Sequence, residues 1–292
     1  MKLLIETPTW LGDAVMASGA IYKLIDYYKP TEVIIFGSFL GISLFKDEYK
    51  TIQDDRKHRI KQLFKLPQVD VAISFRSSFY SKILTKSIAK KGYLFSKSNG
   101  HQVEQYSNYV NKIINQNKIY PPKLNFIPFK YSKSTIGINP GATYGSAKRW
   151  YPEEFAKVAN VLGKNYNIVI FGGPGEEDIA KDIENNLTIK NYQNLCGKLT
   201  IKELCEKIGG LELLITNDSG PMHIASAYGV KIVALFGPTK YNETSPYNTN
   251  YKIVTKNLEC APCMKRECPL KHHECMKLIT ADEVIKASKE IL

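Results

Sequence analysis

The sequence predicts two α/β domains of the nucleotide-binding kind that face a central cleft. Both halves of the 292-residue chain alternate short apolar runs with amphipathic helical patterns, which is typical of parallel sheets covered by helices. Between the halves, residues 119–134 contain three prolines and no periodicity, as expected of a linker. The length suffices for two domains of ordinary size.

The first half is expected to contain three strands and two helices. The strands are KLLIE (2–6), EVIIF (32–36) and VDVAISF (69–75), and the helices span residues 14–28 and 79–91. After the linker the alternation restarts. Strands are expected at 134–139, 166–173, 211–216 and 230–237, with helices at 152–162, 176–184 and 221–229 and a further run at 199–208.

The positive charge is concentrated in the first half. Residues 1–134 contain 21 Lys and Arg against 10 Asp and Glu, whereas residues 135–292 contain 19 against 18. The first half should therefore attract nucleic acid, an acidic membrane surface or a phosphorylated substrate, unless its lysines only form a solvated surface. No signal peptide is apparent, and the most apolar window has 13 residues, too few to span a bilayer. We expect a soluble cytoplasmic protein.

Ligands of open α/β sheets bind beyond the carboxyl ends of the strands, so loops at these ends are the candidate sites. In the first loop, TPTWLGDAV, Gly12 permits a tight turn and Asp13 lies at the start of a helix. Asp13 could merely cap that helix. Alternatively, it could face the cleft and accept a proton from a hydroxyl.

The loop NPGATYGSAKRW has the composition of an anion-binding loop. Gly141 and Gly145 let backbone N–H groups approach a ligand, Thr143 offers a hydroxyl and Lys148 a positive charge. The order of residues is not that of a Walker A loop. A glycine-rich surface loop is the alternative.

The loop FGGPGEEDIA also joins a strand to a helix. Its glycines suit the close approach of a nucleotide, and Glu176 or Glu177 could accept hydrogen bonds from ribose hydroxyls. The glycine spacing is not G-x-G-x-x-G, so a Rossmann dehydrogenase is not supported.

The segment DSGPMH begins another helix after a buried strand. Pro221 favours the first helical turn, and Asp218 or Ser219 can cap it. The helix start around Gly220 is suited to a diphosphate, and His223 can donate a further hydrogen bond unless it is a core histidine. Because Asp218 would repel a phosphate, we expect it to order the loop or to contact a neighbouring hydroxyl.

Four motifs together resemble the ADP-heptose:lipopolysaccharide heptosyltransferases, and most closely the branch that adds the second heptose of the inner core. The motifs are LGDAV, NPGATYGSAKRW, DSGPMHIASAYGV and VALFGPT. The resemblance implies a GT-B fold of two Rossmann-like domains. Residues 1–130 would bind the acceptor, residues 131–279 the nucleotide sugar, and a helix at 280–292 would pack back toward the first domain.

The resemblance also implies an inverting transfer of L-glycero-D-manno-heptose from ADP-heptose to heptosyl-Kdo2-lipid A. Asp13 matches the general base of the family, and Lys148 matches its phosphate-contacting lysine. The positions that correspond to donor contacts are Thr143, Tyr144, Glu176, Leu199, Asp218, Ser219, Gly220 and His223. Basic residues that could contact the phosphorylated lipid acceptor are Lys57, Arg59, Lys61, Arg76 and Lys82. Such a protein would act as a monomer, peripheral to the cytoplasmic face of the inner membrane, and require no cofactor.

A cluster of cysteines follows the donor motifs. Cys260, Cys263, Cys268 and Cys275 have the spacing C-x2-C-x4-C-x6-C, which has the outline of a zinc knuckle. One interpretation is structural zinc. The other is reduced, partly buried thiols, because disulfides are rare in the cytosol.

Other functions remain compatible with parts of the sequence. They are a related transferase that adds the first heptose or another sugar, and a GT-B epimerase or hydrolase that lacks an acceptor. Nucleic-acid binding is disfavoured, because the basic excess and the cysteines lie in opposite halves without interleaved aromatic residues. No Asp-x-Asp pair ends a strand, which disfavours a metal-dependent glycosyltransferase of the other major architecture.

Overall fold

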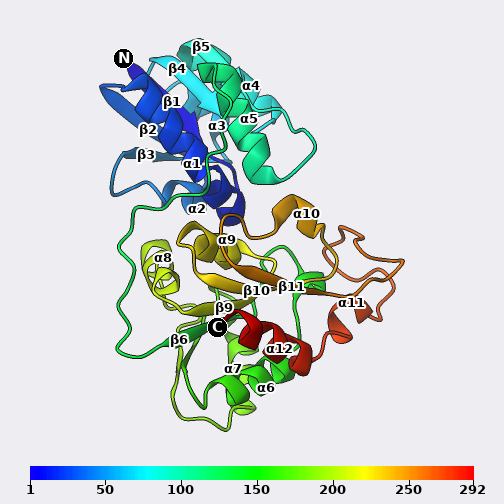
Figure 1. Cartoon of the computed structure of the whole chain (residues 1–292). Coiled ribbons are helices and arrows are strands. Elements are labelled where there is room, and N and C mark those ends of the chain that lie inside the picture. Colours follow the sequence, from blue (N-terminus) through cyan, green and yellow to red (C-terminus); the bar gives the residue numbers. More distant parts are fainter. The chain divides into compact units, whose positions relative to one another are not determined.

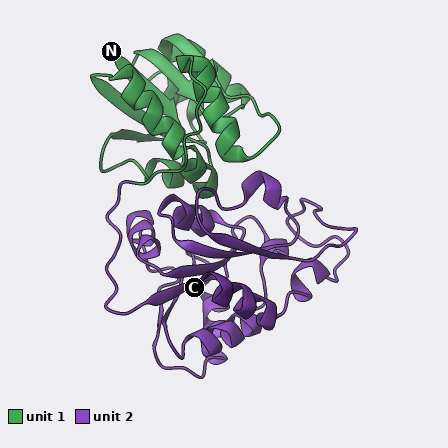
Figure 2. Cartoon of the chain, in the orientation of Figure 1, with its two compact units in different colours: residues 1–124 green, residues 125–292 purple.

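The computed structural model describes residues 1–292, which form two compact units, Met1–Leu124 and Asn125–Leu292 (Figure 2). The division lies within the predicted linker. It falls earlier than the expected boundary at 130, because the following residues pack on the second unit. The backbone N–H of Phe129 donates to the carbonyl of Glu206 at 2.8 Å.

Unit 1 contains a parallel sheet of five strands in the order β3-β2-β1-β4-β5. The strands are β1 (Lys2–Glu6), β2 (Glu32–Gly37), β3 (Lys50–Gln53), β4 (Val69–Ser74) and β5 (Ala89–Leu94). The helices are α1 (Leu11–Tyr28), α2 (Phe39–Ile42), α3 (Arg59–Leu63), α4 (Phe79–Ile88) and α5 (Gln102–Ile114).

The strongly apolar strands of unit 1 were predicted, whereas β3 and β5 were not. In central strand β1, Leu3, Leu4 and Ile5 are fully buried, as expected of a parallel strand covered on both faces. Edge strands β3 and β5 have the polar sequences KTIQ and AKKGYL. The predicted helix 79–91 ends at Ile88, because the chain continues from there as β5.

Unit 2 contains a parallel sheet of six strands in the order β11-β10-β9-β6-β7-β8. The strands are β6 (Thr135–Asn139), β7 (Asn167–Ile170), β8 (Tyr192–Asn194), β9 (Leu213–Asn217), β10 (Lys231–Phe236) and β11 (Tyr251–Thr255). The helices are the 3-10 turn η1 (Ser146–Lys148), α6 (Pro152–Leu162), α7 (Glu177–Asn185), α8 (Ile201–Gly209), α9 (Gly220–Ala227), α10 (Tyr241–Thr244), α11 (Glu274–Lys277) and α12 (Ala281–Ile291).

Helices cover both faces of this sheet. Figure 1 shows α8 and α9 on one face, and α6, α7 and α12 on the other. The final helix α12 packs on α6, β10 and β11, and Val284 and Ile291 belong to the core of unit 2. Its apolar face is thus buried in unit 2, and the expectation that the helix packs back toward the first domain stays a prediction.

Each sheet has a switch point, where successive crossovers lead to opposite sides of the first strand. In unit 1 it lies between β1 and β4, and in unit 2 between β6 and β9. The crevice outside such a point is the usual ligand site of an open α/β sheet. None of the helices is long and apolar enough to cross a bilayer.

Candidate functional site

Two asparagines join the loops at the switch point of unit 2. The amide of Asn139, the last residue of β6, donates to the hydroxyls of Thr216 at 3.2 Å and Ser219 at 3.0 Å. The amide of Asn217, the last residue of β9, donates to the carbonyl of Pro140 at 2.6 Å. Neither asparagine was predicted as a site residue from the sequence. The available signal was that each of two buried strands ends with an asparagine.

Lys148 and Asp218 form a partly buried ion pair in this crevice. Lys148 Nζ lies 2.5 Å from Asp218 Oδ2, and the same oxygen accepts a hydrogen bond from Thr239 Oγ1 at 2.7 Å. Lys148 Nζ also lies 4.6 Å from the ring centroid of Tyr144. Asp218 therefore contacts a neighbouring hydroxyl, as expected, and it also positions the lysine of the predicted anion site.

Helix α9 begins beside this pair. Ser219 is its N-cap residue, but the side chain makes no capping hydrogen bond, and Gly220 is the first helical residue. The N–H groups at the start of a helix favour an anion. His223, one turn further, is buried. The predicted anion loop and the predicted helix start thus meet at one point.

Glu176 lies beside the anion loop. Its Oε2 accepts a hydrogen bond from Gly173 N at 2.8 Å, while its buried Oε1 has no hydrogen-bond partner. A Cβ added to Gly141 would lie 2.0 Å from this carboxylate, so the glycine makes room for it. Leu199 is partly exposed in the loop after β8, just before α8.

In unit 1, Asp13 is the third residue of α1 rather than its cap. The N-cap residue is Trp10, so the interpretation of Asp13 as a simple cap does not hold. The side chain is half-buried at the carboxyl end of β1. Burial and, to a smaller extent, the charge of Asp13 raise the pKa of Tyr106 on α5.

Two of the predicted acceptor contacts, Arg59 and Arg76, already have carboxylate partners. Arg59 donates to both oxygens of Asp54, at 3.0 and 2.6 Å, and Arg76 Nη1 lies 3.1 Å from Asp54 and 3.3 Å from Glu6. Arg76 is only 9% exposed. Because their charges are compensated, these arginines are weaker candidates for binding an anion.

In this network the pKa of Asp54 and the pKa of Glu6 are shifted in opposite directions. Burial alone would raise the pKa of Asp54, but the hydrogen bonds and charges of Arg59 and Arg76 lower it below its usual value. Burial raises the pKa of Glu6, although Arg76 opposes the shift. Asp54 and Glu6 were not predicted, since a single polar residue at a strand end carries no distinctive sequence signal.

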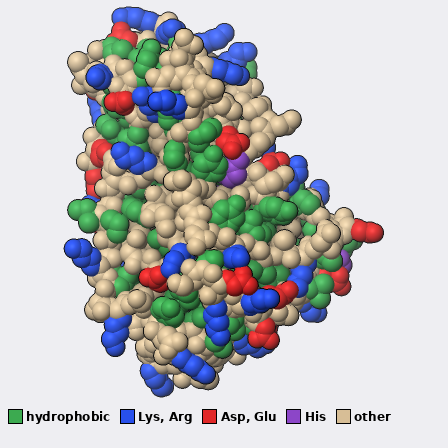
Figure 3. Space-filling model, viewed as in Figure 1, with side chains coloured by type: hydrophobic (Ala, Val, Ile, Leu, Met, Phe, Trp, Pro, Cys, Tyr) green, Lys and Arg blue, Asp and Glu red, His purple; other side chains and the backbone are tan.

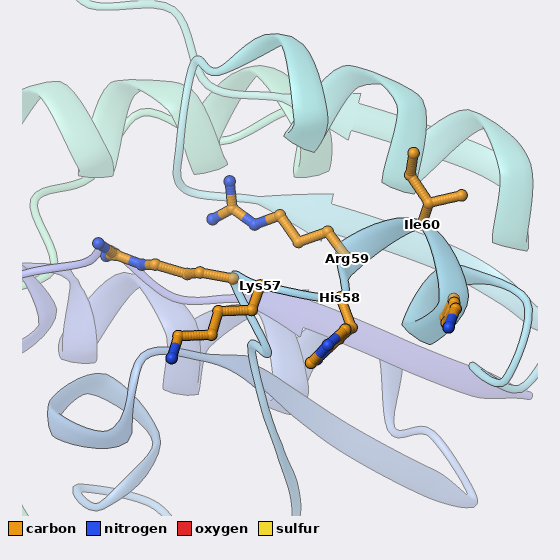
Figure 4. A pocket seen from close by; sticks show the side chains of 6 residues that line it. Lys57, His58, Arg59 and Ile60 are labelled. Atoms are coloured by element: carbon orange, nitrogen blue, oxygen red, sulfur yellow. The ribbon is translucent and has the colours of Figure 1, made fainter.

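The remaining predicted acceptor residues, Lys57, Lys61 and Lys82, are exposed. Residues 56–61 line a hollow of about 380 Å³ in unit 1. In Figure 4, Arg59 and Ile60 point to one side of this segment, whereas Lys57 and His58 point to the other. Lys57 is thus a solvent-facing cation close in sequence to Arg59, whose charge is compensated by Asp54.

The four cysteines of the C-terminal cluster line one small cavity of about 20 Å³, together with His272 and His273. Burial, and then the neighbouring thiols, raise the pKa of Cys275 to about 11. No group of three or more His, Cys, Asp or Glu side chains is arranged so that it could hold a metal ion. Structural zinc therefore stays a prediction.

The cysteine-rich segment supports the anion loop. The carbonyl of Met264 accepts a hydrogen bond from the hydroxyl of Tyr144 at 2.9 Å, and the carbonyl of Arg266 accepts one from Ala147 N at 3.0 Å. His273 Nε2 lies 2.9 Å from the carbonyl of Ala147. The segment therefore holds in place the loop that presents Lys148.

Known proteins are similar to this chain in sequence and in fold. A model of glycosyltransferase family 9 (heptosyltransferase) matches residues 70–274. Lipooligosaccharide heptosyltransferase 2 of Campylobacter jejuni is 41% identical over 317 aligned residues, which cover 100% of this chain and 98% of that protein.

Two solved structures resemble the whole chain. The glycosyl transferase family 9 protein of Veillonella parvula has a TM-score of 0.85 at 21% identity and covers 99% of this chain and 96% of its own. ADP-heptose lps heptosyltransferase II of E. coli has a TM-score of 0.82 at 21% identity and covers 100% and 98%. The likeness confirms the predicted GT-B fold of two Rossmann-like units.

Proposed function

The chain belongs to glycosyltransferase family 9, the heptosyltransferase family, and we propose that it adds the second heptose to the inner core of lipopolysaccharide. The donor is ADP-L-glycero-D-manno-heptose, and the acceptor is heptosyl-Kdo2-lipid A. The observation that carries this proposal is the Lys148–Asp218 pair beside the start of α9. The similarity to lipooligosaccharide heptosyltransferase 2 over the full length supports the choice of acceptor.

Unit 2 binds the donor. Lys148 and the N–H groups at the start of α9 contact the diphosphate, where they neutralise its charge. The unpartnered Oε1 of Glu176 accepts a hydrogen bond from a ribose hydroxyl, and Leu199 contacts the adenine. Occupation by a hydroxyl would satisfy a buried oxygen that otherwise costs stability.

Asp13 acts as the general base. It takes the proton from the attacking hydroxyl of the acceptor heptose, whose oxygen forms a bond to the anomeric carbon of the donor. The bond from that carbon to the ADP oxygen breaks on the opposite side, so the configuration inverts. Lys148 stabilises the charge that develops on the leaving diphosphate, where a preorganised cation contributes most.

Unit 1 binds the acceptor. The exposed Lys57, Lys61 and Lys82 are available for its phosphate groups, whereas Arg59 and Arg76 are engaged by Asp54. Since the acceptor is a membrane lipid, the protein acts as a peripheral protein at the cytoplasmic face of the inner membrane.

The test measures ADP release from ADP-heptose with and without heptosyl-Kdo2-lipid A. We expect release that depends on this acceptor, slower release with Kdo2-lipid A, and a product of inverted anomeric configuration by NMR. Asp13→Asn should reduce turnover by roughly 10²–10⁴-fold and leave the affinity for ADP nearly unchanged.

Each contrary result would identify which part of the proposed function is wrong. Release without any acceptor would indicate a hydrolase, and a preference for Kdo2-lipid A would indicate addition of the first heptose. Near-normal turnover of Asp13→Asn would exclude this residue as the base. Absence of ADP-heptose binding would overturn the donor site.

A further inference from the structure

Helices α3 and α4 expose large apolar side chains on their outer faces. The exposed fractions are 75% for Ile60, 85% for Phe64, 77% for Phe79 and 37% for Ile83. These four residues define the α3–α4 surface. On the inner faces, Leu63 and Leu84 pack into the core of unit 1. The exposed set is therefore not a part of that core.

The two helices lie side by side. They contact each other directly, and the guanidinium of Arg59 on α3 lies 4.5 Å from the ring centroid of Tyr80 on α4. The four exposed apolar side chains therefore lie on two helical segments of unit 1 that contact each other.

Lysines alternate with the apolar residues. Lys61 and Lys65 directly follow Ile60 and Phe64, and Lys82 and Lys86 share the exposed face of α4 with Phe79 and Ile83. Residues 56–91 contain ten Lys and Arg and one acidic residue. That residue is Asp70, which is paired with Lys90 at 2.7 Å. In Figure 3, Lys and Arg side chains are scattered over the visible face of unit 1.

We propose that the α3–α4 surface docks on the headgroup region of an anionic membrane. Its apolar side chains enter the boundary between headgroups and acyl chains, while the lysines reach the lipid phosphates, as basic amphipathic segments do. Long lysine side chains can extend along apolar surface and keep their charge in water. The inference deepens the proposed function and rests on it, because it is the lipid acceptor of that function that brings the protein to a membrane.

The chemistry of the surface favours lipid over a protein partner. The cores of protein interfaces are depleted in lysine, whereas here each apolar pair is flanked by lysines. An anionic membrane accommodates lysines and apolar side chains at once, because its charged headgroups and its acyl chains lie within one side-chain length of each other.

Vesicle sedimentation of the full chain tests the proposal. We compare vesicles of phosphatidylcholine alone with vesicles that also contain phosphatidylglycerol, and we vary the salt concentration. The double variant Phe64→Ser/Phe79→Ser removes apolar area, and Lys65→Gln/Lys86→Gln removes charge. Ile127→Ser is the matched control, because Ile127 is 80% exposed and lies in unit 2.

Wild type should bind the anionic vesicles preferentially, and less at high salt. The apolar variant should lose at least about tenfold in affinity, the charge variant should lose its preference for phosphatidylglycerol, and Ile127→Ser should bind like wild type. Equal binding by both double variants and wild type would overturn the proposal. So would an equal loss in Ile127→Ser, or absence of binding to either vesicle.

A second measurement separates this surface from the catalytic proposal. With a detergent-solubilised acceptor, both double variants should retain the ADP affinity, the melting temperature and the turnover of wild type. A common loss of melting temperature and vesicle binding would attribute the effect to unfolding and overturn the assignment. Vesicle binding without any heptosyl transfer would instead contradict the proposed function and leave the docking surface standing.

Discussion

Lys148 Nζ and Asp218 Oδ2 lie 2.5 Å apart although 70 residues separate them in the chain. The carboxylate also accepts a hydrogen bond from Thr239, so two loops and the strand end of β9 converge on it. An acid in a diphosphate site appears unfavourable at first, because like charges repel. Here the acid instead fixes the position of Lys148, the cation of the proposed diphosphate site.

Substitutions in this pair should distinguish the effect of the Lys148 charge from the effect of its position. Lys148→Ala should weaken ADP binding and reduce kcat/KM, each by roughly 10–100-fold, the value of a hydrogen bond to a charged group. Asp218→Asn retains the Lys148 cation but weakens the contact that positions it, so kcat/KM should fall by a larger factor than the affinity for ADP. Calorimetry with ADP and steady-state kinetics measure both quantities.

Lys157→Ala is the control for the lysine. It removes an exposed cation of unit 2 that pairs only with Glu154, and neither binding nor rate should change. Unchanged ADP affinity in Lys148→Ala would place the diphosphate elsewhere.

Glu176→Gln should identify the ribose contact. The substitution replaces one carboxylate oxygen with an amide donor, so affinity for ADP should fall by roughly tenfold. Affinity for 2′,3′-dideoxy-ADP should be the same in variant and wild type, because this analogue has no ribose hydroxyl to donate. A similar loss for both nucleotides would mean that the residue only supports the glycine loop through Gly173.

Asp54→Asn should destabilise unit 1 at neutral pH. Two arginines would lose their carboxylate, one of them buried, and the free energy of unfolding should fall by roughly 3 kcal/mol. The neighbouring Asp55→Asn is the control, because Asp55 is exposed and pairs only with His58 and nearby backbone groups. Its effect should stay within about 0.5 kcal/mol.

The stabilisation by Asp54 should depend on pH. Its pKa is lower in the folded than in the unfolded state, so the folded protein binds fewer protons. The contribution is fully present above the unfolded value of about 3.9, and it is lost as the pH falls through the folded pKa. Urea unfolding should show the difference between wild type and Asp54→Asn shrinking below about pH 4. A constant difference would contradict the ion pairing.

Gly145→Ala should uncouple the cysteine-rich segment from the anion loop. A Cβ at this position would lie 2.2 Å from the carbonyl oxygen of Arg266, so one backbone segment must move. We expect weaker ADP binding with little change in melting temperature. Unchanged ADP binding in Gly145→Ala would show that the segment does not position Lys148.

Elements and loops were predicted correctly from the sequence where one local pattern was sufficient. The apolar runs predicted β1, β2, β4, β6, β7, β9 and β10, since burial on both faces demands continuous apolar residues. The loops with Asp13, Lys148, Glu176 and Asp218 were found because glycine, helix starts and strand ends have short-range signals. Strands β3, β5, β8 and β11 were not predicted, because their edge positions permit polar residues.

What the sequence by itself determined is the class of fold, the family and the loops that are proposed to carry chemistry. Hydrophobic periodicity and turn residues act over a few neighbours, so they can be read along the chain. Only the tertiary structure decided which charges meet. Arg59 and Arg76 look like available cations in the sequence, but folding places Asp54 between them. It likewise places Asp218 against Lys148, because ion pairs depend on distances across the sheet rather than along the chain.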